Sequence, residues 1–410
     1  MLTLFENGKP IRNLESGVFV VAAIMLTTFG PSGFNFLPLM MGAAAAQFGL
    51  DPATAEGAGA LESIAAVELL VSGVSSIILS LFLLRRVNWR HMLYFSFATL
   101  LVGNLLSMTA TSAEAFMSYR AIAGIGQGMA YALGLASVSV SARPARNFGL
   151  VVSAACLWQV IGFILIPTLT AGDFKPMMQI IALTTVPVLI ASIWVPDNGR
   201  LERDAQLVHS RGNITFRDFA LPAILVLVGF MIFNVSLGII YPYMEIIAGE
   251  LGATTDDFGL AVVAGFLVAA ALGFMAGWID RTFNDVLLIV VFGGINAVLL
   301  WLLAGAATAS TYLILIGLYT AAWNFYYARA FTATSNTDRS GYAASFGPEA
   351  VTSGLIIGPI LAQALTVTGD FSGQIEIAAV AALVGSLVIA FAIRLGHRKA
   401  RQLFDAEAPA

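Results

Sequence analysis

The chain has 410 residues, of which 59% are hydrophobic and only 11% are charged, and its formal net charge is −4. A soluble domain of this size carries about twice that share of charged residues, and the mean hydropathy here is +0.87. These values exclude a soluble globular protein. We expect a lipid bilayer to surround most of the chain, and we expect no nucleic-acid partner.

Apolar stretches of roughly 20 residues, each long enough to cross a bilayer as a helix, recur along the chain. The segment before the first stretch is polar, and no small-residue cleavage site closes that stretch, so we expect an uncleaved cytoplasmic leader. The predicted membrane spans are 16–41, 59–84, 91–110, 113–139, 147–170, 177–195, 218–246, 256–279, 286–305, 311–336, 341–367 and 373–395.

Basic residues divide unevenly between the connections that join these twelve spans. Lys and Arg fall on alternate connections together with both termini, whereas the opposite connections are acidic, with Lys175 as their one basic residue. The positive-inside rule then predicts that both termini are cytoplasmic. The lack of glycosylated outer loops and of targeting segments favours a bacterial inner membrane.

The longest cytoplasmic connection divides the chain into halves of similar length. We expect an N-terminal six-helix bundle over 1–196, a cytoplasmic linker over 197–217, and a C-terminal six-helix bundle with a cytoplasmic tail over 218–410. Pro38 in the first span and Pro242 in the seventh occupy matching places, which indicates pseudo-symmetric halves. Pro31, beside Gly30 and Gly33, predicts a kink in the first span.

Three short motifs accompany the twelve spans. Gly273 to Arg281 reads Gly-Phe-Met-Ala-Gly-Trp-Ile-Asp-Arg, Arg120 to Gly128 places spaced glycines after an arginine, and Gly354 to Pro359 ends in Gly-Pro. With these motifs the chain resembles the major facilitator superfamily over essentially its whole length. The glycines spaced four apart within them also predict close helix packing.

The resemblance implies two six-helix bundles that work by alternating access, with spans 1, 4, 7 and 10 lining the cavity. It also implies gating residues at the inner loops: Gly277, Asp280, Arg281 and, in the first half, Arg85. The fifth span lacks the Gly-Pro pair followed by glycines that is associated with antiporters of the family. That difference argues against drug efflux.

Four charged residues lie well inside predicted spans, away from the span ends: Glu68, Arg120, Arg329 and Glu349. A charge at the bilayer centre costs about 2.5–3.5 kcal/mol on insertion scales, so it needs a partner or water. With a rise of about 1.5 Å per residue, Glu68 and Arg120 both lie toward the outer side, and Arg329 and Glu349 both lie toward the inner side. We therefore predict two ion pairs, Glu68 with Arg120 and Glu349 with Arg329.

Those pairs have two interpretations. Either carboxylate, Glu68 or Glu349, can act as a proton carrier, because burial raises a carboxyl pKa and a nearby cation lowers it, so a substrate that competes for the arginine triggers protonation. Arg120 or Arg329 then anchors the substrate anion. The alternative is a pair of static contacts that lock the helices together.

Uncharged candidates for substrate binding lie on the four predicted cavity spans. Tyr and Trp side chains carry a polar tip that needs a partner when buried, which a wet cavity supplies, although a plain packing face is the alternative. The candidates are Thr28 and Asn35 in span 1, Asn234 and Tyr241 in span 7, and Tyr319, Trp323, Asn324 and Tyr327 in span 10. Trp89, Trp194, Trp278 and Trp301, near helix ends, are predicted to be interfacial anchors.

Together these features predict an all-α polytopic membrane protein of the major facilitator type that acts as a secondary transporter and not as an enzyme. We expect a small organic anion or carboxylate as substrate, protons as the coupling ion, uptake by symport, no cofactor or metal, and a monomer. Proton-antiport efflux of amphipathic compounds is the close alternative. A non-transporting receptor on the same fold and a membrane enzyme are the remaining alternatives.

Overall fold

In a computed structural model of the chain, the structure describes residues 5–6, 9–10, 16–51, 54–84, 86–197, 220–282, 284–337, 343, 346–365 and 371–407. These residues form helices apart from one short hairpin, β1 (Phe5–Glu6) with β2 (Lys9–Pro10), in which Glu6 pairs with Lys9. The chain separates into two compact units. The first comprises Met1–Ala142 and Ala154–Gly199, and the second comprises Arg143–Ser153 and Arg200–Ala410.

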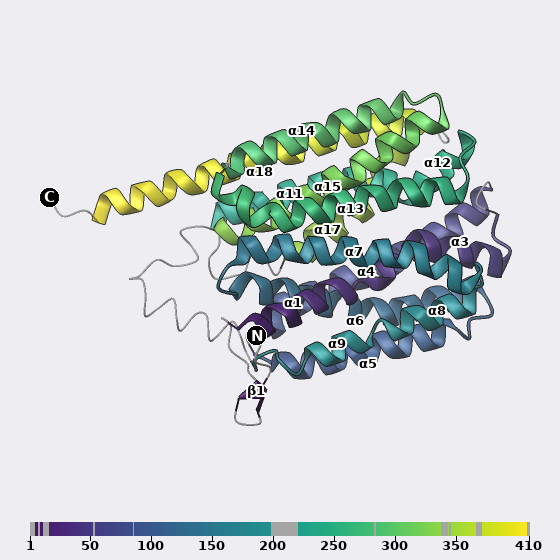
Figure 1. The fold of residues 1–410 in the computed structure, drawn as a ribbon, viewed down its shortest axis with the longest axis horizontal. Helices are drawn as coiled ribbons and strands as arrows, with labels where there is room; N and C mark the ends of the chain where they lie inside the picture. The colour runs from purple at the N-terminus through teal and green to yellow at the C-terminus, as the bar shows by residue number, and fades with distance from the viewer. Residues whose placement is uncertain are drawn as a thin grey trace. The chain divides into compact units, whose positions relative to one another are not determined.

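Each predicted span corresponds to one helix or to a run of consecutive helices (Figure 1). The first half contains α1 (Gly17–Phe29), α2 (Ser32–Asn35), α3 (Leu37–Phe48), α4 (Ala55–Ile78) with its π-helical continuation η1 (Leu79–Leu83), α5 (Trp89–Ser107), α6 (Ala113–Val140), α7 (Pro144–Thr170), α8 (Phe174–Leu183) and α9 (Val186–Ala191).

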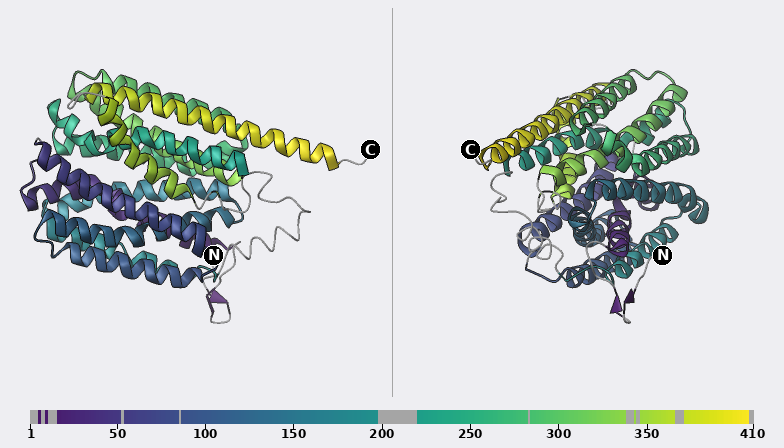
Figure 2. Two further views of the ribbon diagram at one scale, coloured as in Figure 1. Left: turned by 180° about the vertical axis from the view of Figure 1, so that it is seen from behind. Right: turned by 60° about the vertical axis from the view of Figure 1, so that its left-hand side comes forward.

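The second half follows the same order. It contains α11 (Ala220–Ile240), the 3-10 turn η3 (Tyr241–Tyr243), α12 (Met244–Glu250), α13 (Thr255–Thr282), α14 (Asp285–Ala304), α15 (Ala309–Thr337), α17 (Gly347–Leu365) and α18 (Phe371–Glu407). Helix α18 packs along α14 and runs on past the predicted span end at 395 (Figure 2).

The helices begin where the sequence offers capping side chains. Ser112 Oγ accepts from the backbone N–H of Ala115 at 3.2 Å, and Thr54 Oγ1 accepts from Gly57 N at 3.1 Å. Such caps satisfy backbone donors that the first helical turn leaves without a partner. Asn88 and Asn284 cap α5 and α14 in the same way.

The first span of each half is broken rather than continuous. Helix α1 ends at Phe29, and Pro31, whose ring nitrogen carries no hydrogen, precedes the one-turn helix α2. The predicted kink is therefore present as a full interruption. In the second half, α11 ends at Ile240 and Pro242 lies in the 3-10 turn that follows. Both halves thus interrupt their first span near a proline.

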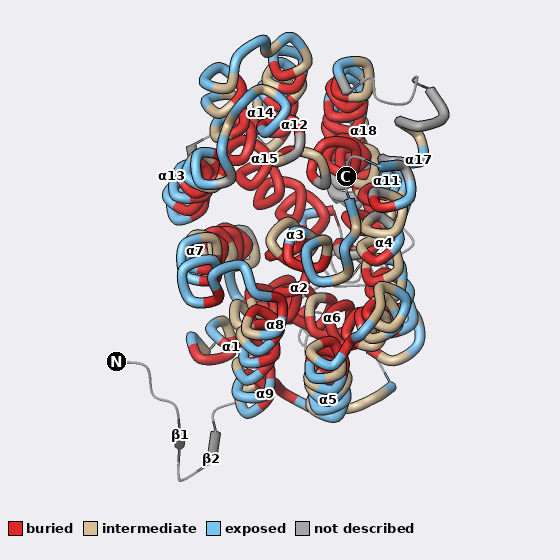
Figure 3. Tube along the Cα trace, turned by 90° about the vertical axis from the view of Figure 1, so that its right-hand side faces the viewer, coloured by how far each residue is buried: buried red, intermediate tan, exposed pale blue. Residues whose placement is uncertain are grey.

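Two helices form the buried centre of their units, α6 in the first and α15 in the second (Figure 3). Helix α6 packs on α1, α4 and α5, and α15 packs on α13, α14 and α11. Large apolar side chains remain exposed elsewhere, among them Leu169, Phe274 and Trp301. Such exposure would be costly in water, whereas hydrocarbon lipid accepts it. Eight helices of the described residues are long and apolar enough to cross a bilayer, and three shorter apolar helices accompany them.

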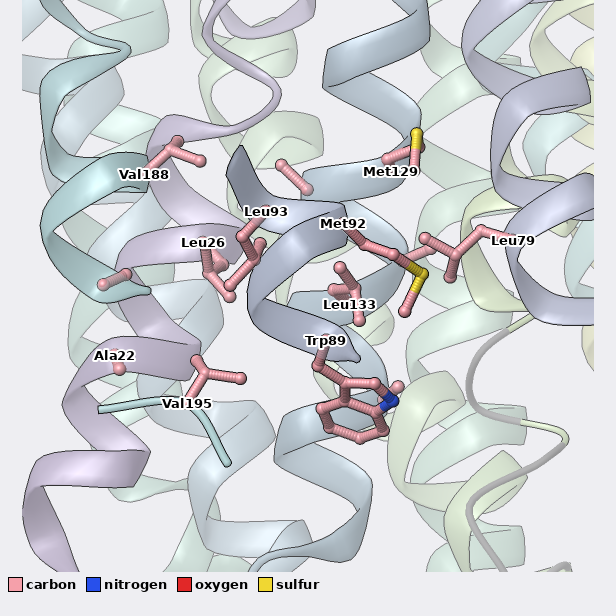
Figure 4. Packing of buried hydrophobic residues seen from close by; sticks show 14 of the residues in the cluster. Ala22, Leu26, Leu79, Trp89, Met92, Leu93, Met129, Leu133, Val188 and Val195 are labelled. Carbon is pink, nitrogen blue, oxygen red and sulfur yellow. The ribbon is translucent and has the colours of Figure 1, made fainter. Parts of the chain in front are cut away.

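Tryptophan 89 lies in the core of the first unit, packed with Met92, Leu93 and Leu133 (Figure 4). Its side chain is 0% exposed, and its Nε1 donates to the carbonyl oxygen of Leu84 at 2.8 Å. The predicted role as an interfacial anchor is wrong for this residue. Burial with a satisfied N–H explains its position instead.

Glycines bring α4 and α6 into close contact. A Cβ atom at Gly124 would lie 2.7 Å from the carbonyl oxygen of Glu68, and one at Gly128 would overlap the carbonyl oxygen of Ser72. Small residues four apart allow two helix backbones to approach in this way. The spacing therefore sets how near the side chains of α4 come to those of α6.

We expect Gly128→Ala to destabilise the protein by about 1–3 kcal/mol, because the added methyl group has no space against α4. The thermal unfolding midpoint of the detergent-purified protein measures this effect. Gly42→Ala is the matched control, since a Cβ atom there meets nothing within 4 Å. An equal response of the two variants would contradict the close approach.

Candidate functional site

A buried ion pair joins α4 and α6 in the first unit. Arg120 Nε donates to Glu68 Oε2 at 2.8 Å, and Arg120 Nη2 donates to Glu68 Oε1, so the contact is bidentate. Both residues are only 1% exposed. Planar guanidinium and carboxylate groups match in this geometry, which is among the strongest charged contacts available to a protein. The predicted Glu68–Arg120 pair is confirmed.

Asn104 on α5 completes the coordination of Arg120, because its Oδ1 accepts from Arg120 Nη1 at 2.6 Å. Asn104 is also buried. Three helices of the unit therefore converge on one guanidinium. Asn104 was not among the predicted residues, since a neutral amide inside a span looks the same in the sequence whether it binds a charge or only joins two helices.

The interrupted first span lies directly against this pair. A Cβ atom at Gly33 would collide with Arg120 Nη2 and with Glu68 Oε1, and it would lie 2.9 Å from Gln127 Oε1. The same Gln127 oxygen accepts from the backbone N–H of Phe34 at 3.3 Å. Gln127 lies seven residues after Arg120 on α6, two turns along the same face. The short helix α2 is thus held against the ion pair through its backbone.

Polar side chains around the break satisfy backbone groups that the interruption leaves open. Asn35 Nδ2 donates to the carbonyl oxygen of Thr28 at 3.1 Å, and Ser32 Oγ donates to Phe29 O at 2.8 Å. Trp158 Nε1 donates to Ser32 Oγ at 3.3 Å. The side-chain amide nitrogen of Asn35 therefore binds the backbone of its own span. The buried Thr28 hydroxyl has no hydrogen-bond partner among the described residues.

The charged cluster of the second unit is built differently. Arg329 Nη2 donates to Thr332 Oγ1 at 3.1 Å, and Arg329 Nη1 lies 3.9 Å from Asp285 Oδ1. Asn336 Nδ2 donates to Asp285 Oδ2 at 3.0 Å. Asp285 and Asn336 were not among the predicted residues. Glu349 is buried at the start of α17, and its pairing with Arg329 stays a prediction.

Span 10 and span 7 meet at a hydrogen bond between neutral side chains. The Tyr327 hydroxyl donates to Asn234 Oδ1, and Asn234 Nδ2 donates to the carbonyl oxygen of Phe230 at 2.8 Å. A carbonyl oxygen only accepts, so the amide nitrogen must face Phe230 and the amide oxygen must face Tyr327. Two of the predicted binding residues, Asn234 and Tyr327, are thereby brought together.

The three remaining predicted residues of span 10 are all buried and differ in their polar contacts. Asn324 Nδ2 donates to the carbonyl oxygen of Thr320 at 2.8 Å, four residues earlier on α15, which is a helix-internal contact. Tyr319 is fully buried beside Ser236. Trp323 is 5% exposed, and its Nε1 has no hydrogen-bond partner among the residues that the structure describes.

One further predicted residue lies at the end of α11, and the other four lie outside the residues or side chains that the structure describes. Tyr241 is buried in the 3-10 turn η3 at the end of α11. Arg85 lies outside the described residues, and neither the surroundings of Gly277 nor the side chains of Asp280 and Arg281 are described. The gating role expected for these four residues stays a prediction.

Comparison with known proteins places this arrangement in a family. The sequence profile described as Major Facilitator Superfamily matches residues 18–346. The E. coli fucose:proton symporter FucP has a similar structure, with a TM-score of 0.65 and 14% identity over 91% of this chain and 98% of that chain. The human organic anion transporter MFSD10 (TETRAN) matches with a TM-score of 0.65 and 14% identity over 91% of this chain and 97% of that chain.

A second FucP structure, in the outward conformation, matches with a TM-score of 0.64 and 13% identity over 92% of this chain and 97% of that chain. No curated protein sequence matches the chain significantly. At identities this low, the structural likeness shows the fold alone.

The fold and the family profile define the class as an all-α integral membrane transporter fold with twelve spans. The chain belongs to the Major Facilitator Superfamily. Members of this family are transporters and not enzymes, so the predicted fold class and the exclusion of an enzyme are both confirmed.

We expect Gly33→Ala to abolish or strongly reduce transport, because the methyl group would occupy the space of the Arg120–Glu68 contact. Either α2 must move away or the ion pair must open. Gly59→Ala is the control, since a Cβ atom there meets nothing within 4 Å. Wild-type transport by Gly33→Ala would contradict the close approach of α2 to the pair.

Removing one partner of the ion pair should cost more than removing both. We expect Arg120→Leu and Glu68→Leu each to destabilise the protein by roughly 3–5 kcal/mol, because each leaves a buried charge without its partner. The double variant, which leaves neither charge, should be more stable than either single variant. Unfolding midpoints of the three variants measure the coupling, and simple additivity would show that the charges do not depend on each other.

Proposed function

We propose that the protein is a secondary active transporter that carries a small organic anion together with protons by alternating access. Glu68 is the proton carrier and Arg120 the anion anchor in this proposal. The observation that carries it is the bidentate Arg120–Glu68 pair, which is almost fully buried, is bound by Asn104 and lies against the backbone at Gly33.

The net charge of this pair supports symport. With Glu68 ionised, the two side chains sum to zero, and the site is stable in a medium of low dielectric constant. When an anion takes the place of the carboxylate beside Arg120, Glu68 becomes a buried charge without a partner unless it binds a proton. Binding an anion and a proton together keeps the sum at zero, so each stabilises the binding of the other.

The net charge of the site also disfavours proton-driven efflux of cations. A cation that approaches ionised Glu68 also approaches Arg120, whose positive charge is permanent. The site would then carry an uncompensated positive charge, which is costly when buried. Efflux of neutral amphipathic compounds, which add no charge to the pair, is the alternative function.

Two of the structures with a similar fold have names that agree with parts of the proposal. One solved structure of the same fold is named a fucose:proton symporter and another an organic anion transporter. Those names describe those proteins. For this chain, the two names are consistent with the proposed coupling to protons and with the proposed anionic substrate.

The arrangement in the membrane is part of the proposal. We propose that both termini are cytoplasmic in a bacterial inner membrane, because Lys and Arg concentrate on the connections that share a side with the termini. We further propose that the linker over 197–217 joins six-helix bundles over 1–196 and 218–410, that Gly277, Asp280, Arg281 and Arg85 gate the inner side, and that the protein acts as a monomer. Glu349 beside Arg329 is a second candidate coupling pair.

In proteoliposomes, we expect an inwardly directed proton gradient to drive accumulation of a carboxylate identified by thermal-shift screening. Glu68→Gln should abolish the response to the gradient and retain exchange of labelled for unlabelled substrate, because a neutral amide imitates the protonated carboxyl group. Glu376→Gln, a change at an exposed carboxylate on α18, is the control and should behave like wild type. Uptake by the wild type that ignores the gradient would refute proton coupling, and gradient-driven uptake by Glu68→Gln would remove Glu68 from the carrier role.

A further inference from the structure

The indole of Trp323 presents a buried polar group that no described residue pairs with. Its Nε1–H has no hydrogen-bond partner among the described residues, and the side chain is 5% exposed. A donor buried without an acceptor destabilises the folded state unless something else supplies that acceptor. Trp89 offers a direct contrast, because its indole N–H is also buried and donates to Leu84 O.

The ring of Tyr327 contacts this indole, and Tyr327 contacts further aromatic rings. Trp323 and Tyr327 pack edge to face, with ring centroids 5.1 Å apart and an interplanar angle of 72°. Tyr327 in turn contacts Phe230 at 5.0 Å and Phe331 at 6.1 Å, both edge to face. Ring edges carry partial positive charge and ring faces partial negative charge, so such a cluster favours another aromatic ring over a saturated ring of equal size.

The rest of the cluster is held in place by its own contacts. The Tyr327 hydroxyl donates to Asn234, whose amide is fixed by Phe230 O. Arg329, two residues further along α15, donates to Thr332 and approaches Asp285. Among Trp323, Tyr327, Phe230 and Phe331, the Trp323 N–H is therefore the side-chain polar group that has no hydrogen-bond partner among the described residues.

We infer that the cluster of Trp323, Tyr327, Phe230 and Phe331 recognises the aromatic ring of the substrate, and that Trp323 Nε1–H donates to an oxygen on that substrate. The substrate class is then an aromatic carboxylate rather than an aliphatic one. This inference rests on the proposed transport function and narrows its substrate.

The test uses pairs of acids that differ only in ring character. Benzoate and phenylacetate are compared with cyclohexanecarboxylate and cyclohexylacetate, by thermal shift and by inhibition of uptake into proteoliposomes. The proteins compared are wild type, Trp323→Phe and Trp89→Phe. We expect the aromatic acid of each pair to bind wild type about threefold to tenfold more tightly.

Trp323→Phe keeps an aromatic wall and deletes the N–H, so we expect roughly a tenfold loss of affinity for benzoate. Without ligand, Trp323→Phe should lower the unfolding midpoint less than Trp89→Phe, because only the second change deprives a backbone carbonyl of its donor. Trp89→Phe should leave the affinity for benzoate unchanged.

Equal binding of aromatic and saturated acids would overturn the inference, as would unchanged benzoate affinity in Trp323→Phe, or no binding by any aromatic acid. The proposed transport function fails by a different result. If a proton gradient still drives uptake of the saturated acids, anion symport stands and only the aromatic preference is wrong. If no acid responds to the gradient in wild type, the transport proposal itself is wrong.

Discussion

The low dielectric constant of a membrane interior makes an isolated charge costly in free energy. In the first unit, three helices and the interrupted first span surround the charge of Arg120. Helix α4 supplies Glu68, α5 supplies Asn104, and the backbone of the interrupted first span closes over the pair at Gly33. Each contribution requires two helix backbones to approach closely. The glycines of α6 permit that approach, so the small residues of this helix and its single arginine belong to one arrangement.

The second unit follows the same order of helices and distributes its polar groups differently. Its central helix α15 carries Arg329 near the end of the helix, where Thr332 and Asp285 share it, and carries neutral aromatic residues before it. The arginine of α6, Arg120, instead lies about two turns from the start of its helix. Two halves with related helix orders therefore need not carry equivalent sites.

The spans, the break at Pro31 and the Glu68–Arg120 pair could be predicted because each follows from a large energy: the cost of polar backbone in lipid, the missing N–H of proline, and the cost of a buried charge. Asn104 and Gln127 could not, because a neutral amide is compatible with many neighbours and its partner depends on helix rotation. Trp89 was mistaken for an interfacial residue since position near a helix end does not reveal which way the side chain points. Asp285 was missed because an acidic residue at a helix start has an adequate local explanation in the helix dipole.

The bidentate geometry also constrains the order of events in the proposed cycle. While Glu68 is ionised, two of its bonds hold Arg120, so an anion reaches the guanidinium only as those bonds open. Opening without a proton would leave a buried carboxylate unpaired, which makes protonation and anion entry mutually dependent. In the reverse direction, the departing anion leaves Arg120 unpaired, and Glu68 regains its partner only by releasing the proton. In the proposed cycle, a carrier that crosses the membrane with one ligand and not the other would have to hold an uncompensated charge in low dielectric, and that cost would oppose a leak of protons.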